Sequence, residues 1–225
     1  MRQLPLAMRL EAAPGLSNFT IGANAAAVAS LRARPLAPTP IYLWGATGAG
    51  KSHLLQALAR DLAENGERVG AVSPASALPW EWDEGWSALL IDDCHALDAD
   101  HQHAAFAFFV EAQTHGVPVI AAGRLPPVDL PLRDDLRTRL GWGLVFQIEP
   151  PVEEDVRATL RREADRRGLF LSDDVMSYLM TRLARDLGSL MGLLDRLDEF
   201  ALERQRAITV PLVREMLSDP EAAKP

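Results

Sequence analysis

A glycine-rich segment, GATGAGKS at residues 45–52, constrains the fold of this 225-residue chain more than any other feature. It fits the pattern G-x-x-x-x-G-K-[ST] and follows the apolar run IYLW (41–44). The next segment carries its leucines on one helical face and reaches Gly66, a predicted C-terminal stop. Strand, loop and helix in this order let backbone amides bind phosphate, whereas an ordinary glycine turn needs no such context. The segment therefore predicts a P-loop domain that binds a nucleotide.

The residue types in this loop suit phosphate binding. Glycines let backbone amides approach phosphate oxygens, Lys51 reaches the terminal phosphates, and Ser52 can ligate Mg²⁺. A packing or helix-surface role is the favoured interpretation of His53, which follows the serine. We assign the cofactor contacts to eight residues: Gly45, Thr47, Gly48, Ala49, Gly50, Lys51, Ser52 and His53.

Two carboxylates end an apolar strand-like run in LLIDDCH (89–95), with Asp92 following Lys51 by 41 positions. Asp92 is expected to hold the metal, directly or through water, and Asp93 to polarise an attacking water. Alone, a strand that ends in two aspartates mostly marks the start of a loop. At this distance after a P-loop, it is interpreted as the second half of the nucleotide site.

The segment CHALDADHQH (94–103) also offers zinc-ligand side chains, namely Cys94, His95, His101 and His103. The first two lie just past the strand that must face the nucleotide. Asp98 or Asp100 is better interpreted as the N-cap of a helix. We therefore expect no zinc site in this segment.

Three of the five tryptophans fall in LPWEWDEGW (78–86). Stacking on a base or on a partner is one interpretation. Because no lysine or arginine lies beside them, packing between a strand and a helix is the favoured one.

Short apolar runs alternate with helix-like stretches through the first two thirds of the chain. The runs are IYLW (41–44), RVGAV (68–72), ALLI (88–91), VPVIAA (117–122) and LVFQI (144–148). Such alternation predicts an α/β fold, here a P-loop domain with a buried parallel β-sheet flanked by helices.

After EPPVEED (149–155) only helix-like periodicities follow, which predicts a small all-helical lid. Its first helix has an apolar residue at every fourth position: Val152, Val156, Leu160 and Ala164. Ser172 is the expected N-cap of the second helix, and Pro211 is expected near the start of the last. The predicted domains are a tail (1–17), a nucleotide-binding base (18–150) and a helical lid (151–225).

Charge and cysteine content narrow the class of protein. The net charge of −8, from 31 acidic and 23 basic residues, argues against broad attraction to nucleic acid. No run of about 18 apolar residues occurs, so no membrane span is predicted. Cys94 is the single cysteine and cannot form an internal disulfide, so a reducing, cytoplasmic setting is expected.

A P-loop base followed by a helical lid resembles the AAA+ class. Within it, LLIDDCH (89–95), RLPPVDLPLRDDLRTRLGWGL (124–144) and IEPPVEEDVRATLRREADRRGLFLSDDV (148–175) resemble the DnaA-like family, from about Asn18 onward. DnaA continues after its lid into a helix-turn-helix DNA-binding domain, whereas this sequence ends about seven residues after Ser218. The acidic chain is therefore more similar to the Hda branch of that family, and it is not expected to recognise an origin.

The resemblance implies function, ligands and partners. Hda proteins join the DNA polymerase III β sliding clamp on DNA and trigger hydrolysis of the ATP held by DnaA, which limits re-initiation. The resemblance implies that this chain binds ADP or ATP and has DnaA and the clamp as partners. DNA would be reached only through the clamp. A homodimer is left open. The resemblance makes Arg139 the arginine finger that acts in trans, with Arg137 beside it.

Two positions depart from the family pattern. The fourth apolar run ends AAGR (121–124), so Ala122, Gly123 and Arg124 stand where the family has a polar sensor residue and an aspartate. In the lid, the family's sensor arginine aligns with Gly188, although Arg185 is near in sequence. Both departures predict weak ATP hydrolysis in the chain's own site and leave Arg139 unaffected.

The leading tail MRQLPLAMRL is either a first piece of core or a ligand for another protein. Hda proteins carry an N-terminal clamp-binding peptide with a glutamine followed by leucines at alternate positions. The matching residues here are Gln3, Leu4, Leu6 and Met8. Such a peptide would lie extended in a groove of the clamp, with Pro5 limiting the entropy lost on ordering.

Two other function classes have less support in the sequence. A stand-alone phosphotransfer enzyme should show a second substrate signature, and none occurs. A helicase loader would be expected to carry a helicase-binding domain before the base, where only about 17 residues stand. The lid arginines at 157, 161, 162, 166 and 167 alternate with acidic residues, which favours a mutually paired, solvated face over a DNA contact.

Overall fold

The computed structural model describes residues 15–16, 19–182 and 187–218. The chain divides into two compact units, with the boundary between Glu149 and Pro150. Among the described residues, every helix is too short or too polar to cross a membrane.

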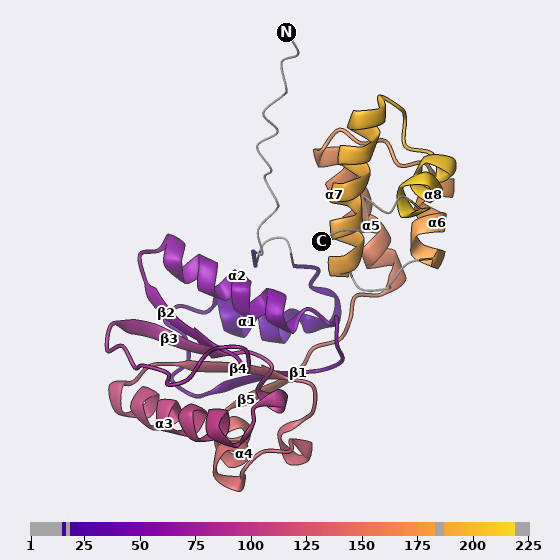
Figure 1. Cartoon of the computed structure of the whole chain (residues 1–225). Helices are drawn as coiled ribbons and strands as arrows, with labels where there is room; N and C mark the ends of the chain where they lie inside the picture. Colours follow the sequence, from indigo (N-terminus) through magenta and orange to yellow (C-terminus); the bar gives the residue numbers. More distant parts are fainter. Residues whose placement is uncertain (1–14, 17–18, 183–186, 219–225) are drawn as a thin grey trace. The chain divides into compact units, whose positions relative to one another are not determined.

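The base is built on one five-stranded parallel sheet (Figure 1). Its strand order is β2-β3-β4-β1-β5, and all four strand pairs are parallel. The strands are β1 (Ile41–Trp44), β2 (Arg68–Val72), β3 (Trp86–Ile91), β4 (Val119–Gly123) and β5 (Leu144–Gln147). Each predicted apolar run forms a strand, and the predicted α/β fold is confirmed.

Helices cover both faces of this sheet (Figure 1). On one face lie α1 (Ala25–Arg32) and α2 (Lys51–Glu64), and on the other α3 (Ala99–His115) and α4 (Asp134–Gly141). Because successive strand residues point to opposite faces, Leu43 joins the first apolar core and Tyr42 the second. Short 3₁₀ helices, η1 (Gly22–Asn24), η2 (Cys94–Ala96) and η3 (Pro127–Asp129), complete the base.

The end of α2 follows the sequence signal. The helix stops at Glu64, and Gly66 adopts a left-handed conformation with φ of +80°. Only a residue without a Cβ takes that conformation at little cost, so the predicted stop is confirmed.

The edge strand β5 differs from the predicted buried strand. Leu144 and Val145 are 40% and 38% exposed. Among the described residues the strand pairs with β1 alone, so it forms one edge of the sheet. Burial had been inferred from the apolar run alone, which does not tell an edge strand from a central one.

The tryptophan-rich segment packs against α3, as predicted. Trp80, Trp82 and Trp86 each lie 5.6–5.7 Å, centroid to centroid, from the ring of Phe108. Offset and edge-on contacts of this kind favour a packed cluster.

The second unit is all-helical, as predicted for the lid. Its helices are α5 (Glu153–Arg166), α6 (Asp173–Arg182), α7 (Leu187–Arg204) and α8 (Val210–Ser218), and they share one apolar core. Ser172 caps α6, since its Oγ accepts a hydrogen bond from the Val175 amide at 3.3 Å. Pro211 is the second residue of α8. The first residue of the apolar repeat lies outside the helix it predicted: Val152 is the N-cap of α5 and is 64% exposed.

Three arginines of α5 pair with carboxylates, as expected of a solvated face. Arg157 pairs with Glu153 at 3.6 Å, Arg166 with Glu163 at 2.8 Å and Arg161 with Asp173 at 2.5 Å. Arg167 forms a further ion pair with Asp195. The basic charge of this helix is therefore largely balanced within the lid.

Candidate functional site

The glycine loop turns sharply between β1 and α2. Gly45 has φ of +153°, and a Cβ there would lie 2.3 Å from the carbonyl oxygen of Ile148. Gly50, the N-cap of α2, has φ of +98°, and a Cβ there would lie 2.8 Å from the ring of Phe19. Backbone conformation and space both require glycine at these two positions, which leaves the loop amides accessible at the N-terminus of α2.

Lys51 is the first residue of α2 and is 6% exposed. Its Nζ donates hydrogen bonds to the carbonyl oxygens of Gly45 and Ala46, both at 2.8 Å. Burial lowers the pKa of Lys51, and the negative charges of Asp93 and Asp92 act against that shift. The ammonium group is thus held inside the loop, close to two carboxylates.

The aspartate pair lies beside the loop at the carboxyl edge of the sheet. Asp92 directly follows β3, and its backbone amide donates to the carbonyl oxygen of Val72 at 2.9 Å. Its carboxylate accepts a hydrogen bond from the Asp93 amide at 2.8 Å. Asp93 has φ of +46° and begins the turn into η2. The strand order therefore brings together the loop and the aspartates that the sequence had linked by spacing alone.

His53 packs at the base of the loop. Its ring centroid lies 5.8 Å from that of Phe19, and its Nε2 lies 3.4 Å from the carbonyl oxygen of Gly15. Burial lowers the pKa of His53, which favours the neutral imidazole. These contacts agree with a packing role.

Two residues of this region were missed from the sequence. Phe19 borders Gly50, and His95 lies with its Nδ1 3.8 Å from a carboxylate oxygen of Asp93. The pKa of His95 is lowered, first by burial and then by the positive charges of Arg124 and Lys51. Phe19 stands far from the loop in sequence with no spacing rule to link them, and His95 had been considered only as a zinc ligand.

Arg139 lies elsewhere on the base. It sits on α4, where its Nη1 donates to Oε1 of Gln113 on α3 at 2.9 Å, and its Cζ lies 4.9 Å from the ring centre of Phe106. Arg137 pairs instead with Asp134 of the same helix at 2.5 Å. The helices α3 and α4 cover the face of the sheet opposite to α2, so these contacts hold Arg139 away from the helix that follows the loop.

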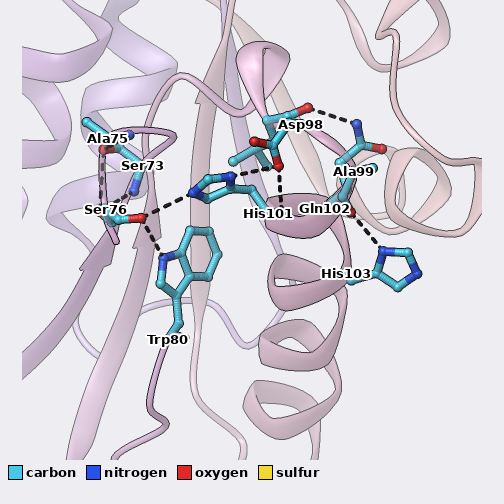
Figure 2. Close-up of polar contacts among 10 residues, drawn as sticks. Ser73, Ala75, Ser76, Trp80, Asp98, Ala99, His101, Gln102 and His103 are labelled. Atoms are coloured by element: carbon cyan, nitrogen blue, oxygen red, sulfur yellow. Dashed lines mark hydrogen bonds and ion pairs between the residues drawn. The ribbon is translucent and has the colours of Figure 1, made fainter. Parts of the chain in front are cut away.

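His101 and His103, which lie in the segment with zinc-ligand side chains, have protein partners (Figure 2). Nδ1 of His101 lies 2.8 Å from a carboxylate oxygen of Asp98, and its Nε2 lies 3.1 Å from the carbonyl oxygen of Ser76. His103 contacts the carbonyl oxygen of Ala99 through Nδ1 at 2.8 Å. Asp98 also accepts the His101 amide at 2.9 Å, which confirms Asp98 as the N-cap of α3.

Residues 153–217 match the family model described as Hda, lid domain. Domain III of the replication initiation protein DnaA from Thermotoga maritima is similar with a TM-score of 0.75 at 23% identity, over 94% of this chain and 97% of that chain. The chain has the AAA+ fold and carries an Hda lid domain.

Two further solved structures share the AAA+ fold. AMPPCP-bound DnaA from Aquifex aeolicus has a TM-score of 0.66 at 21% identity, over 93% of this chain and 80% of that one. The RuvB Holliday junction branch migration motor of Thermotoga maritima has a TM-score of 0.59 at 16% identity, over 79% and 60%. At these identities the likeness concerns the fold.

The departures from the DnaA-like pattern fall on both units of this chain. In the base, Ala122 and Gly123 are the last residues of β4 and are buried, and exposed Arg124 follows them. In the Hda lid, Gly188 lies in the first turn of α7. Arg185 and the residues predicted to bind the clamp, Gln3, Leu4, Leu6 and Met8, lie outside the described residues.

Proposed function

We propose that this DnaA-related AAA+ regulator stimulates hydrolysis of ATP bound to DnaA, acting in trans from the DNA-loaded sliding clamp, and so limits re-initiation of replication. The Hda lid and the DnaA-like fold support the regulator class. The observation that carries the finer proposal is the position of Arg139. Its guanidinium lies at the α3–α4 face of the base and contacts Gln113, away from the helix that follows the chain's own P-loop.

Arg139 has the chemistry that a trans-acting residue needs. A guanidinium is permanently protonated and presents donors in a planar fork that matches phosphate oxygens. Placed against the nucleotide of another protein, it stabilises the charge on the transferring phosphoryl group. Because Gln113 is neutral, moving Arg139 towards a phosphate breaks one hydrogen bond and separates no ion pair.

The chain's own site is proposed to hold ADP or ATP as a structural ligand. The glycine loop and buried Lys51 fit a polyphosphate, and the ammonium would exchange the carbonyls of Gly45 and Ala46 for phosphate oxygens. Ala122 and Gly188 carry no polar side-chain group to assist hydrolysis. A nucleotide held without turnover stabilises the folded base by mass action.

Mg²⁺ would fit at the carboxyl edge of the sheet, beside the glycine loop. Ser52 and Asp92 are partly exposed and offer oxygen donors, which this ion prefers. In the described part of the chain no group of three or more histidine, cysteine or carboxylate side chains could hold a metal. Phosphate and water would therefore complete the coordination, and the bound ion would neutralise phosphate charge.

The N-terminal tail is proposed to bind the DNA polymerase III β sliding clamp through Gln3, Leu4, Leu6 and Met8. Contact with DNA would then be indirect. Clamp pull-down tests this: Gln3→Ala and Leu6→Ala should each reduce recovery, and undiminished recovery of both variants would contradict the tether.

The function itself is tested by ATP turnover. Clamp loaded on DNA, ATP-bound DnaA and the full chain are mixed, and phosphate release is followed. We expect wild type to accelerate hydrolysis and Arg139→Ala to lose about 10³- to 10⁵-fold of that stimulation, about 4–7 kcal/mol of transition-state stabilisation. Arg137→Ala, the neighbouring arginine whose charge is paired with Asp134, is the matched control. Equal stimulation by wild type and Arg139→Ala would refute the proposal.

A further inference from the structure

A pocket with a volume of about 370 Å³ opens at the amino edge of the sheet, beside the ends of α3 and α4. Pro40, which precedes β1, and Val119, the first residue of β4, lie in its wall. The glycine loop and the aspartate pair follow the opposite, carboxyl ends of β1 and β3. The pocket is therefore separate from the nucleotide site, and its volume is in the range of small-molecule sites.

The floor of the pocket is apolar and closely packed. Phe109, Ala112 and Val119 line it and are at most 4% exposed. The carbonyl oxygen of Pro40 accepts a hydrogen bond from the Leu144 amide at 2.9 Å, which ties the wall to β5. Because the three floor residues belong to one core cluster of the base, the pocket offers an apolar group a surface that needs no rearrangement.

The rim of the pocket carries an exposed aromatic side chain. Trp142 is the C-cap of α4 and is 73% exposed, although it borders the apolar floor. An apolar ligand in the pocket would remove part of this indole from water, which favours binding. A flat ring suits the space best, because aromatic rings stack on one another at low conformational cost.

Arg139 is the one charged residue that lines the pocket among the described residues. Its partners are neutral, namely Oε1 of Gln113 at 2.9 Å and the ring of Phe106 at 4.9 Å from Cζ. The two aspartates of α4 pair with other arginines of the base. In the described part of the chain no carboxylate balances the charge of Arg139, so an incoming carboxylate would meet a cation ready to form a bidentate pair.

We propose that this pocket binds a small aromatic monocarboxylate, with its ring between Trp142 and the apolar floor and its carboxylate on the Arg139 guanidinium. Both α3 and α4 end here, and the negative end of a helix disfavours anions, so one carboxylate held by the guanidinium is favoured over a polyphosphate. Nε2 of Gln113, whose oxygen the ligand displaces, can donate to the same carboxylate. A bound ligand would hold Arg139 on this chain and block its action on the ATP of DnaA, a consequence that rests on the proposed function.

The probe is indole-3-acetate, and indole-3-acetamide is its uncharged isostere. Both are titrated into the full chain while the indole N–H signal of Trp142 is followed by NMR. A ligand of this size is expected to bind wild type with a Kd of about 1 mM, and the amide about 10-fold more weakly. Arg139→Gln should weaken binding of the acetate about 10-fold or more and that of the amide by less than about 3-fold. Arg137→Gln removes a neighbouring charge outside the pocket and should bind both probes as wild type does.

Three outcomes would overturn the site. The first is a Trp142 signal that indole-3-acetate does not move, and the second is equal affinity of wild type and Arg139→Gln for the acetate. The third is a wild type that sediments as a dimer while Trp142→Ala sediments as a monomer, because a second copy would then cover the pocket. Unchanged binding of the amide to Arg139→Gln shows that the substitution leaves the pocket folded.

The ATP-turnover assay separates this site from the proposed function. Indole-3-acetate should suppress the stimulated hydrolysis of DnaA-bound ATP at the concentrations that saturate the Trp142 signal, and indole-3-acetamide should not at the same concentrations. If wild type does not stimulate DnaA at all, the proposed function fails and the NMR titration still decides the site. If the acetate leaves the Trp142 signal unmoved while Trp142→Ala loses stimulation, the pocket receives a side chain of DnaA and the carboxylate site is wrong.

Discussion

Arg139 and Gln113 are joined by a hydrogen bond across the two helices that cover one face of the sheet, with Nη1 and Oε1 2.9 Å apart. The ring of Phe106 lies on the same guanidinium at 4.9 Å from its Cζ. Trp142 is exposed and lies beside them. Together with Phe109, Gln113 and Arg139 it lines one pocket of the base. The proposed trans-acting residue is therefore held at a surface that has both polar and apolar groups to offer a partner.

The first prediction concerns this hydrogen bond. Gln113→Glu turns it into an exposed ion pair, which is stronger by up to about 1 kcal/mol, so Arg139 leaves it less readily. We expect stimulated hydrolysis of DnaA-bound ATP to fall by about 2- to 5-fold, with a larger deficit at low salt than at high salt. Gln56→Glu adds the same charge at an exposed position of α2 and should leave stimulation unchanged. A Gln113→Glu protein that matches wild type at low salt would show that Arg139 does not move from Gln113.

Much of the fold was predictable because its signals are local. Each strand is a short apolar run bounded by turn residues, and Ser172 and Gly66 mark helix ends through chemistry confined to a few positions. Exposure of β5 was not predictable, because it depends on the strand order.

The candidate site was likewise only partly predictable from the sequence. The glycine loop has its own sequence pattern, but the closeness of Arg124 to Lys51 requires β4 to lie between β3 and β1. The contact of Arg139 with Gln113 likewise depends on how α3 packs against α4. Contacts between distant segments leave no spacing rule in a single sequence. From the sequence, Arg124 is therefore recognised only as one of the residues that stand in place of the family's polar sensor residue and aspartate.

The second prediction concerns pH. Both ring nitrogens of His101 face acceptors, a carboxylate oxygen of Asp98 and the carbonyl oxygen of Ser76, so the doubly protonated ring satisfies both (Figure 2). Hydrogen bonding to Asp98, then to Ser76, raises the pKa of His101 in the folded chain. Its stabilisation is therefore complete below the unfolded pKa of about 6.5 and is lost as the pH rises through the higher folded value.

Urea unfolding between about pH 5.5 and pH 8.5 tests this through the difference between wild type and His101→Gln, because His53 and His95, whose pKa values are lowered, contribute with the opposite sign. The stability that wild type has over His101→Gln should be largest at about pH 5.5 and should shrink as the pH rises. His103→Gln is the matched control, since His103 is exposed and contacts only a carbonyl of its own helix in the structure described. The idea fails if His101→Gln keeps the wild-type pH slope. All five tryptophans belong to the base, so their fluorescence follows the unit that contains His101.

The third prediction pairs two glycines with opposite outcomes. Gly50→Ala places a Cβ against Phe19 at a left-handed position, so it should destabilise the base by about 1–2 kcal/mol and weaken nucleotide binding. Gly192 is an exposed residue inside α7 with open space around its Cβ, so Gly192→Ala should stabilise the lid by about 0.5–1 kcal/mol. Tryptophan fluorescence reports the base, whereas far-ultraviolet circular dichroism reports the helices of both units, so an unfolding step seen by circular dichroism without a fluorescence change is assigned to the lid. Changes of the same sign in the free energy of unfolding for the two substitutions would contradict the inferred strain at Gly50.

The last prediction separates two positions of one sequence pattern. Val152 and Leu160 both belong to the four-residue repeat that predicted the first lid helix, yet Leu160 is 1% exposed in the lid core and Val152 is 64% exposed as the N-cap. Leu160→Ala removes buried methyl groups and leaves a cavity, so the lid should lose about 2–5 kcal/mol of unfolding free energy. Val152→Ala should change it by less than about 0.5 kcal/mol, as surface substitutions usually do. Denaturant titration followed by circular dichroism measures both, and a large loss in Val152→Ala would mean that the side chain is buried in solution.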